Sequence, residues 1–183
     1  SYLHRPLSRP ASSVDLGEVT ETSMILIAHR GNITCPHRSR ENTPGYIDIA
    51  LALGYDVELD IRGADGRLWM GHDIHESIPV STEFLKEREA HLWVHCKNAM
   101  AIQMILELTP GVRFFFHHAD DYTLTSDGFV WCYPGKTPPT PRSIAVLPET
   151  VMRRESIPGY LLTERVVGVC SDYVGELSEF QNA

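Results

Sequence analysis

The sequence has few cysteines, and no two of them have the spacing of a metal-binding or redox motif. The four cysteines, Cys35, Cys96, Cys132 and Cys170, are scattered without a C-x-x-C pair. Three of them lie in apolar runs of strand length, where a free cysteine acts as a small buried hydrophobic side chain. We therefore expect a reduced, cytoplasmic protein. An even number of cysteines also allows disulfide pairing, for which the spacing gives no support.

Long hydrophobic runs are missing as well. The longest apolar stretch, residues 47–53, contains Asp48 and is too short to span a bilayer. Residues 1–23 mix serine, proline and arginine and lack the apolar core of a secretory signal. Met24 directly precedes the first strand-like run. We therefore expect residues 1–23 to be a flexible arm or a leader added by cloning, and residues 24–183 to form a single domain.

Positive charge is in short supply. Lysine and arginine total 16 against 24 aspartates and glutamates, which gives a net charge of -8. This balance argues against a nucleic-acid-binding protein, because clustered basic residues hold phosphate backbones. A small phosphorylated substrate is still allowed, since it needs only local positive charge or a metal ion.

Short apolar runs recur from Met24 onward and predict a barrel of parallel strands. Helix signals lie between several of them: Thr43-Pro44 to Gly54, Ser81 or Thr82 to Ala90, and an Asn98 cap before residues 99–108. Alternating strands and helices favour a closed, TIM-like α/β barrel. The chain is shorter than the roughly 250 residues of typical barrels, so some crossover helices must be shortened or missing. The eight runs are Ile25–Ala28, Tyr55–Ile61, Leu68–Gly71, His91–Cys96, Val112–Phe116, Gly128–Tyr133, Ser143–Leu147 and Val166–Cys170.

Reactive side chains follow the first strands in a fixed order. Side chains two residues apart on a strand share a face, so Glu58 and Asp60 lie together. Paired carboxylates suit Mg²⁺, Mn²⁺ or Ca²⁺. By the same rule His95 and Lys97 share a face. The polar clusters are His29-Arg30-Gly31, Glu41-Asn42-Thr43, Glu58-Leu59-Asp60 and His72-Asp73.

The carboxyl ends of parallel barrel strands meet at one rim, where barrel active sites lie. To bring His72 to that rim, we expect residues 61–64 to run back down, Asp65-Gly66 to turn, and residues 67–72 to climb again. Each cluster alone is commonly a surface or capping feature. Their order at successive strand ends nevertheless favours metal-assisted phosphoester chemistry. The side chains expected to converge are His29, Glu58, Asp60, His72, His95 and Lys97.

These motifs resemble the glycerophosphodiester phosphodiesterase family, within the superfamily that includes phosphoinositide-specific phospholipase C. A weaker similarity at residues 168–173 places Asp172 at the end of the last strand. The resemblance implies a TIM-like barrel, in agreement with the strand count. It rests on Ala28-His29-Arg30-Gly31, Arg40-Glu41-Asn42-Thr43, Val57-Glu58-Leu59-Asp60-Ile61, Asp65-Gly66 and Gly71-His72-Asp73.

The resemblance also implies roles. His29 and His72 would be the general acid and base, since histidine titrates near neutral pH. Arg30 would grip the phosphate, while Glu58 and Asp60 would hold the divalent ion. Glu41, in the second cluster, would support the metal or its waters, and its neighbour Asn42 would help to set the conformation of the loop.

One later strand departs from the family pattern. Family members usually carry a Glu-x-Lys pair there, and this chain has His95-Cys96-Lys97. Lys97 keeps the register expected for phosphate contact. An imidazole at His95 still allows a third metal ligand and shifts preference toward Mn²⁺ or Zn²⁺ over Ca²⁺; alternatively, the site has lost its metal. Beyond it, His117 and His118 are candidates for a further metal ligand or for contact with substrate, and Tyr133 is a candidate for lining the pocket.

Taken together, these features predict a phosphoric diester hydrolase of a small, glycerophosphodiester-like substrate. Direct attack by water and a cyclic phosphate route both remain open. One alternative is a non-catalytic phosphoryl-ligand binding barrel that has lost full metal coordination, although a binder needs no pair like His29 and His72. Another is a different metal-dependent barrel hydrolase, such as a phosphomonoesterase. The sequence leaves the oligomeric state open.

Overall fold

The computed structural model describes residues 23–135 and 139–181, in which ten strands form one sheet. The expected arm at residues 1–23 lies outside the described residues except for Ser23. Each of the eight expected runs contains a strand, and β4 and β7 add two more in connecting segments. The strands are β1 (Ile25–His29), β2 (Asp56–Ala64), β3 (Arg67–Met70), β4 (Ile78–Val80), β5 (Leu92–Cys96), β6 (Phe114–Phe115), β7 (Tyr122–Leu124), β8 (Val130–Cys132), β9 (Ser143–Val146) and β10 (Gly168–Ser171).

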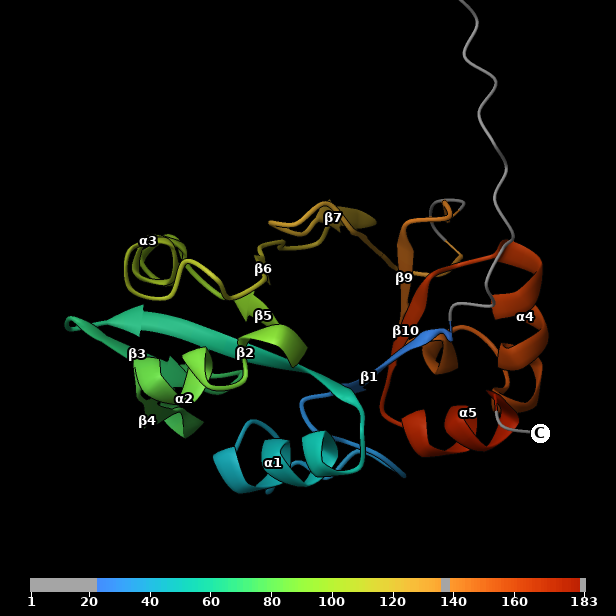
Figure 1. Ribbon diagram of the computed structural model, residues 1–183, viewed down its shortest axis with the longest axis horizontal. Helices are drawn as coiled ribbons and strands as arrows, with labels where there is room; N and C mark the ends of the chain where they lie inside the picture. Colours follow the sequence, from blue (N-terminus) through green and yellow to red (C-terminus); the bar gives the residue numbers. More distant parts are fainter. Residues whose placement is uncertain (1–22, 136–138, 182–183) are drawn as a thin grey trace, which may run out of the picture.

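The sheet curves into a half-barrel around its parallel strands (Figure 1). These strands lie in the order β6-β5-β2-β1-β10-β9-β8, and β7 pairs antiparallel with β8. The expected closed ring is not shown: no strand ladder joins β6 to β7 among the described residues. Hydrogen bonds between Phe114 and Ser126 cross this opening instead. With only two residues, β6 is too short to extend the ladder.

The helices lie on the outer side of the sheet. Asn98 caps α3, as expected, by accepting a hydrogen bond from the backbone N–H of Ala101. Ser81 caps α2, but that helix is shorter than expected because residues 89–91 form a 3₁₀ turn. The helices are α1 (Pro44–Ala52), α2 (Thr82–Lys86), α3 (Ala99–Leu108), α4 (Ile157–Glu164) and α5 (Val174–Gln181); the 3₁₀ turns are η1 (Ile74–Glu76), η2 (Glu89–His91), η3 (Pro148–Thr150) and η4 (Arg154–Ser156).

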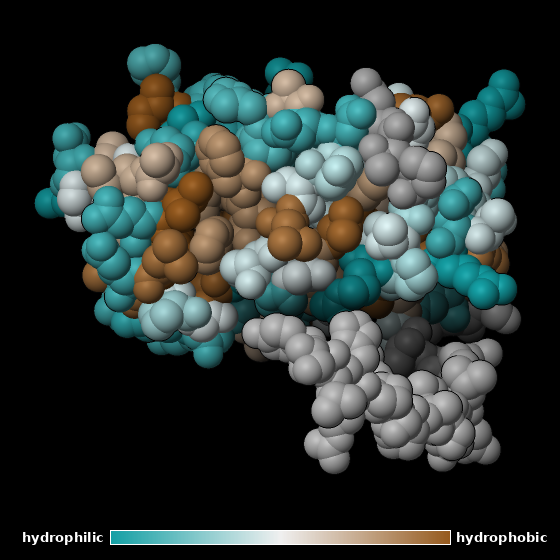
Figure 2. All heavy atoms as spheres, turned by 90° about the horizontal axis from the view of Figure 1, so that it is seen from above, coloured by the Kyte–Doolittle hydropathy of each residue, from teal (hydrophilic) through white to brown (hydrophobic). Residues whose placement is uncertain are grey.

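Crossover helices are missing between β6 and β9 in the described part of the chain, as the short sequence predicts. Apolar side chains consequently remain at the surface there: Phe116, Tyr122 and Leu124 are 41%, 56% and 64% exposed. Figure 2, which views this side of the molecule, shows apolar residues at the surface over α3 and near β7. None of the helices in the described ranges is long and apolar enough to cross a membrane.

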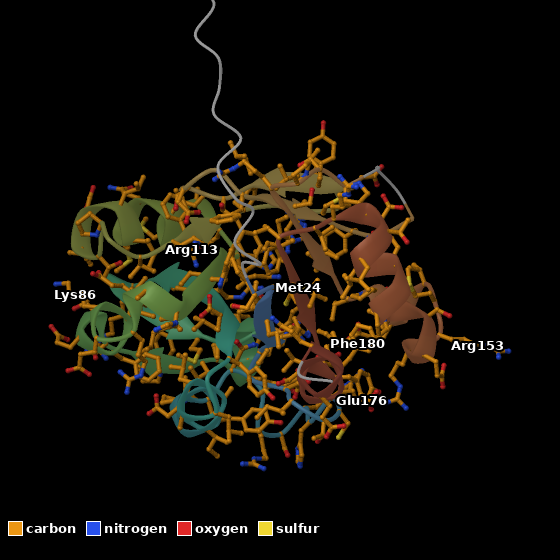
Figure 3. All side chains as sticks on the ribbon, turned by 45° about the vertical axis from the view of Figure 1, so that its right-hand side comes forward. Met24, Lys86, Arg113, Arg153, Glu176 and Phe180 are labelled. Atoms are coloured by element: carbon orange, nitrogen blue, oxygen red, sulfur yellow. The ribbon has the colours of Figure 1, made fainter. Side chains whose placement is uncertain are left out.

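Strand alternation divides the core into two layers. Val57, Leu59 and Ile61 face outward beneath the helices. The interior instead holds large rings, with Trp93 and Trp131 5.8 Å apart between ring centroids. Arg113, labelled in Figure 3, lies over the Trp93 ring, 3.9 Å from its centroid. This packed interior leaves the polar residues to gather at the rim.

The path from Asp60 to His72 corrects one expectation. Residues 61–64 do not run back down and residues 67–72 do not climb again, because β2 continues without a break to Ala64 and β3 runs antiparallel to it. Asp65 and Gly66 both have positive φ angles, 51° and 69°, which make the tight hairpin that β3 follows antiparallel to β2. The hairpin still returns the chain to Asp60, whose carbonyl accepts a hydrogen bond from the Gly71 N–H at 3.0 Å.

Candidate active site

Strand register pairs the reactive residues at the rim. His29 ends β1 and lies opposite Glu58 on β2. One step further along β2, on the same face, Asp60 lies opposite His95 on β5. Glu58, Asp60 and His95 are 3%, 0% and 7% exposed, so all three polar groups are buried. Such burial is costly unless partners compensate the charges.

Glu58, Asp60 and His95 form a candidate metal centre. Each offers one ligand atom, and these atoms lie within 4.8 Å of one another. His95 Nδ1 is 3.1 Å from Asp60 Oδ1 and 3.9 Å from Glu58 Oε1. His95 Nε2 is buried without a hydrogen-bond partner among the described residues. Two carboxylates and an imidazole are a donor set that fits a divalent ion.

The charges of this centre are unevenly compensated. Burial and the nearby Asp60 charge raise the pKa of Glu58 above its ordinary value. Burial would also raise the pKa of Asp60, but His95, Arg30 and Lys97 hold it well below its usual range. The positive charge is therefore concentrated at Asp60. A cation beside Glu58 would complete the balance, which supports the fit of a divalent ion.

Arg30 and Lys97 are the cations at the rim. Arg30 Nε lies 3.0 Å from Asp60 Oδ2, and Lys97 Nζ lies 3.4 Å from Asp60 Oδ1. Arg30 has a left-handed backbone with a φ of 52°, which turns its own N–H toward Glu58 Oε2 at 3.3 Å. Strained backbone of this kind is often found at functional sites.

The second sequence cluster organises the loop around these groups. Asn42 donates to Asp60 Oδ2 at 3.0 Å and accepts from the Asp60 N–H at 2.9 Å, so it fixes that carboxylate. Glu41 accepts from Arg30 at 3.2 Å and from Asn32 at 2.9 Å. Glu41 therefore contacts the guanidinium, and Asn42 contacts a candidate metal ligand.

Asp172 is a site residue to which the sequence argument gave no chemical role. It follows β10, which pairs with β1, and its Oδ1 lies 2.7 Å from His29 Nδ1. Asn32 donates to the same oxygen at 2.8 Å. A barrel places its last strand beside its first, and this was the signal from which the contact between Asp172 and His29 could have been predicted.

The His29–Asp172 contact sets the electrostatics of both groups. Burial lowers the pKa of His29, but the Asp172 hydrogen bond and the Glu58 charge outweigh it, so the net pKa is raised. Burial raises the pKa of Asp172, but the hydrogen bond with His29 outweighs this effect, so the net pKa of Asp172 lies below its ordinary value. With Nδ1 held by Asp172, His29 Nε2 is directed toward Glu58, 3.8 Å away.

His72 is less enclosed than His29. Its side chain is 47% exposed and lies 3.3 Å from Asp73, and its carbonyl accepts a hydrogen bond from Arg62. The structure thus brings together Glu58, Asp60 and His95 with Arg30, Lys97 and His29, and it leaves His72 at the margin. The acid–base pairing of His29 with His72 stays a prediction.

Comparison with solved structures identifies proteins of similar fold. The chain is similar to a phosphodiesterase from Oleispira antarctica, solved in complex with the product sn-glycerol-3-phosphate: the TM-score is 0.50 and the identity 14%, covering 87% of this chain and 97% of that one. The expected resemblance is confirmed for the fold.

Two further structures show weaker likeness. A putative glycerophosphodiester phosphodiesterase from Galdieria sulphuraria gives a TM-score of 0.48 at 11% identity, covering 87% of this chain and 98% of that one. A putative glycerophosphoryl diester phosphodiesterase from Silicibacter pomeroyi DSS-3 gives 0.46 at 13% identity, with 88% and 94% covered. No protein-family model matches the sequence, and a search of curated proteins finds no match.

Proposed function

We propose that this protein is a metal-dependent hydrolase of small, glycerophosphodiester-like phosphodiesters. The observation that carries the proposal is the buried group Glu58, Asp60 and His95, placed at a barrel rim beside two cations. Its fold is similar to that of a phosphodiesterase whose structure holds sn-glycerol-3-phosphate, which supports a glycerol phosphate moiety in the substrate.

Each side chain at the rim has a role in this proposal. Glu58, Asp60 and His95 would hold Mg²⁺, Mn²⁺ or Ca²⁺, and such an ion would supply positive charge to balance the charge that builds on the phosphoryl oxygens. Arg30 and Lys97 orient the phosphate group. Arg30 makes directional contacts through its planar guanidinium, whereas Lys97 acts as a point charge.

His29 moves a proton in the reaction. Asp172 fixes the side chain through Nδ1 at 2.7 Å, which leaves Nε2 free to exchange a proton with the phosphodiester or its attacking nucleophile. His72 supplies the complementary acid or base from the exposed hairpin. That position requires His72 to turn toward the bound substrate, because its present ion-pair partner is Asp73.

Metal removal and restoration tests the function. We expect hydrolysis of a generic aryl phosphodiester and of glycerophosphodiesters to stop with a chelator and to return with Mg²⁺, Mn²⁺ or Ca²⁺. The Glu58→Gln variant should lose at least about 100-fold of the activity at a fixed metal concentration. Full activity in the chelator, or in the Glu58→Gln variant, would contradict the proposal.

A second function, non-catalytic binding of a phosphoryl ligand, is favoured by one observation. Arg30 and Lys97 already neutralise Asp60, and such cations bind phosphate without a metal. A binding protein would take up sn-glycerol-3-phosphate equally well in the chelator and hydrolyse no diester. Calorimetry beside the activity assay separates the two functions.

The wider setting of this activity is also part of the proposal. We place the protein in the cytoplasm and its catalytic unit in one domain at residues 24–183, with a small-molecule substrate as its partner. All four cysteines are free, which supports a reducing compartment.

A further inference from the structure

A histidine and a tyrosine beside the metal centre have no role in the mechanism above. His117 follows β6 by two residues, and Tyr133 directly follows β8. Both strands are parallel to β5 and β2, so both residues are at the same rim as the candidate metal ligands. Tyr133 Oη and His117 Nε2 are 2.9 Å apart, within hydrogen-bond distance.

His117 adjoins the metal centre through its ring. It stacks on His95 with the ring centroids 4.5 Å apart and the planes only 7° from parallel. Metal ligation uses a lone pair in the plane of the imidazole ring, so two parallel stacked rings do not direct their nitrogens at one ion. His117 therefore packs against a candidate ligand without sharing its metal.

A cavity opens on the other side of this pair. Its volume is about 330 Å³, at the small end of ligand pockets, which suits a compact molecule. His117 and Tyr133 both line it, and His117 Nδ1 is buried without a hydrogen-bond partner in the described structure. His117 thus adjoins both the candidate metal ligand His95 and this accessible cavity.

The charge of the lining restricts what this cavity can hold. Asp120 contributes negative charge, and no lysine or arginine lines the cavity in the described part of the chain. A second anionic group next to Asp120 would be repelled, whereas hydroxyl or ammonium groups would be accommodated. The Tyr133 ring adds an aromatic surface that also tolerates a cation.

We infer that this cavity is the subsite for one alcohol group of the phosphodiester, with Tyr133 and His117 as its specificity-determining residues. The alcohol is small and carries no negative charge, and its hydroxyl or ether oxygen takes a hydrogen bond from Tyr133 Oη, which His117 Nε2 holds in place. This inference rests on the proposed function, because the metal centre fixes the phosphate beside the cavity.

The test compares two diesters of sn-glycerol-3-phosphate that differ only in the second alcohol. With the second alcohol in the cavity, the methyl diester places no hydroxyl group there, whereas the glycerol diester places two. We expect Tyr133→Phe and His117→Phe to lower the glycerol-to-methyl ratio of kcat/KM about tenfold, the effect of losing one hydrogen bond. Tyr122→Phe, on the exposed face of β7, is the matched control and should keep the wild-type ratio.

The discrimination of the cavity against negatively charged alcohols is tested separately. Asp120→Asn should raise kcat/KM for a diester of an anionic alcohol, such as glyceric acid, about fivefold relative to the glycerol diester. An unchanged glycerol-to-methyl ratio in both phenylalanine variants would overturn the subsite. An equal loss on both diesters would also overturn it, because His117 and Tyr133 would then only support His95.

Failure of the proposed function can be distinguished from failure of the subsite. If the wild-type protein hydrolyses neither diester, binding of the intact glycerol diester is measured by calorimetry with the same variants. Tighter binding of the glycerol than of the methyl diester, lost in Tyr133→Phe, would support the subsite without catalysis. Equal binding of the two diesters would overturn it.

Discussion

Asp172 shows how single residues acquire function from their neighbours. An aspartate after the last strand is unremarkable in sequence, yet its carboxylate lies 2.7 Å from His29 Nδ1. That contact selects the tautomer and the orientation of the imidazole, as oriented histidines in hydrolases require. The proton-transfer role that we propose for His29 therefore depends on a residue 143 positions away in the chain.

The Asp172→Asn variant tests this dependence. An amide keeps the shape but loses the charge that stabilises protonated His29, so we expect kcat to fall about 100-fold. Steady-state kinetics with the methyl diester measures the change. The control is Asp127→Asn, which removes an ion pair with Arg113 at the opposite end of the strands and should leave kcat unaffected. A wild-type kcat in Asp172→Asn would show that His29 acts without its partner.

His95 is the residue that we propose to set the metal preference of the candidate centre. Replacing the imidazole by a third carboxylate in His95→Glu favours harder ions, so we expect the affinity ratio of Ca²⁺ over Mn²⁺ to rise about tenfold. Isothermal titration calorimetry measures both affinities. The exposed His75→Glu variant adds the same charge outside the candidate ligand set and should preserve the wild-type ratio. If His95→Glu also preserves it, His95 is not a ligand.

Between elements, Asn98 joins a strand to a helix. Its side chain accepts from the N–H groups of Gly63 and Ala101 and donates to the Gly63 carbonyl, so it caps α3 and extends the edge of β2. The sequence predicted the cap from residue type and spacing alone. The contact of Asn98 with β2 could not be predicted from the local sequence, because Gly63 is 35 positions away in the chain.

Removing this junction should destabilise the fold. We expect Asn98→Ala to lower the free energy of unfolding by about 2–3 kcal/mol, because it removes one cap and leaves backbone groups of Gly63 unpaired. Urea unfolding followed by circular dichroism gives the value. Asn98→Asp keeps the acceptor and loses only the donor, so it should cost less. Equal stability of Asn98→Ala and the wild type would contradict the role of the junction.

For the whole molecule, curvature of the sheet determines which groups reach solvent. Cys96, Cys132 and Cys170 are buried in the sheet, and burial raises the pKa of the Cys96 thiol to about 12. Cys35 lies in the exposed loop before α1. The fold therefore protects three thiols and leaves one accessible.

Thiol titration tests this arrangement. In the folded protein we expect one thiol to react rapidly with a disulfide reagent such as dithionitrobenzoate, and the other three to react only in denaturant. Cys35→Ser should abolish the rapid phase. Rapid reaction of two or more thiols in the folded wild type would mean that the sheet opens readily, for example at the break between β6 and β7.

The sequence by itself determined the local features of this protein. Apolar runs marked the eight expected strands, Asn98 and Thr43-Pro44 marked helix starts, and alternation placed Glu58 with Asp60, because each of these depends on neighbours in the chain. Tertiary structure alone decided that β2 continues to Ala64, that the ladder stays open at β6, and that Asp172 reaches His29. These outcomes depend on strand pairing over long separations, which no local pattern specifies.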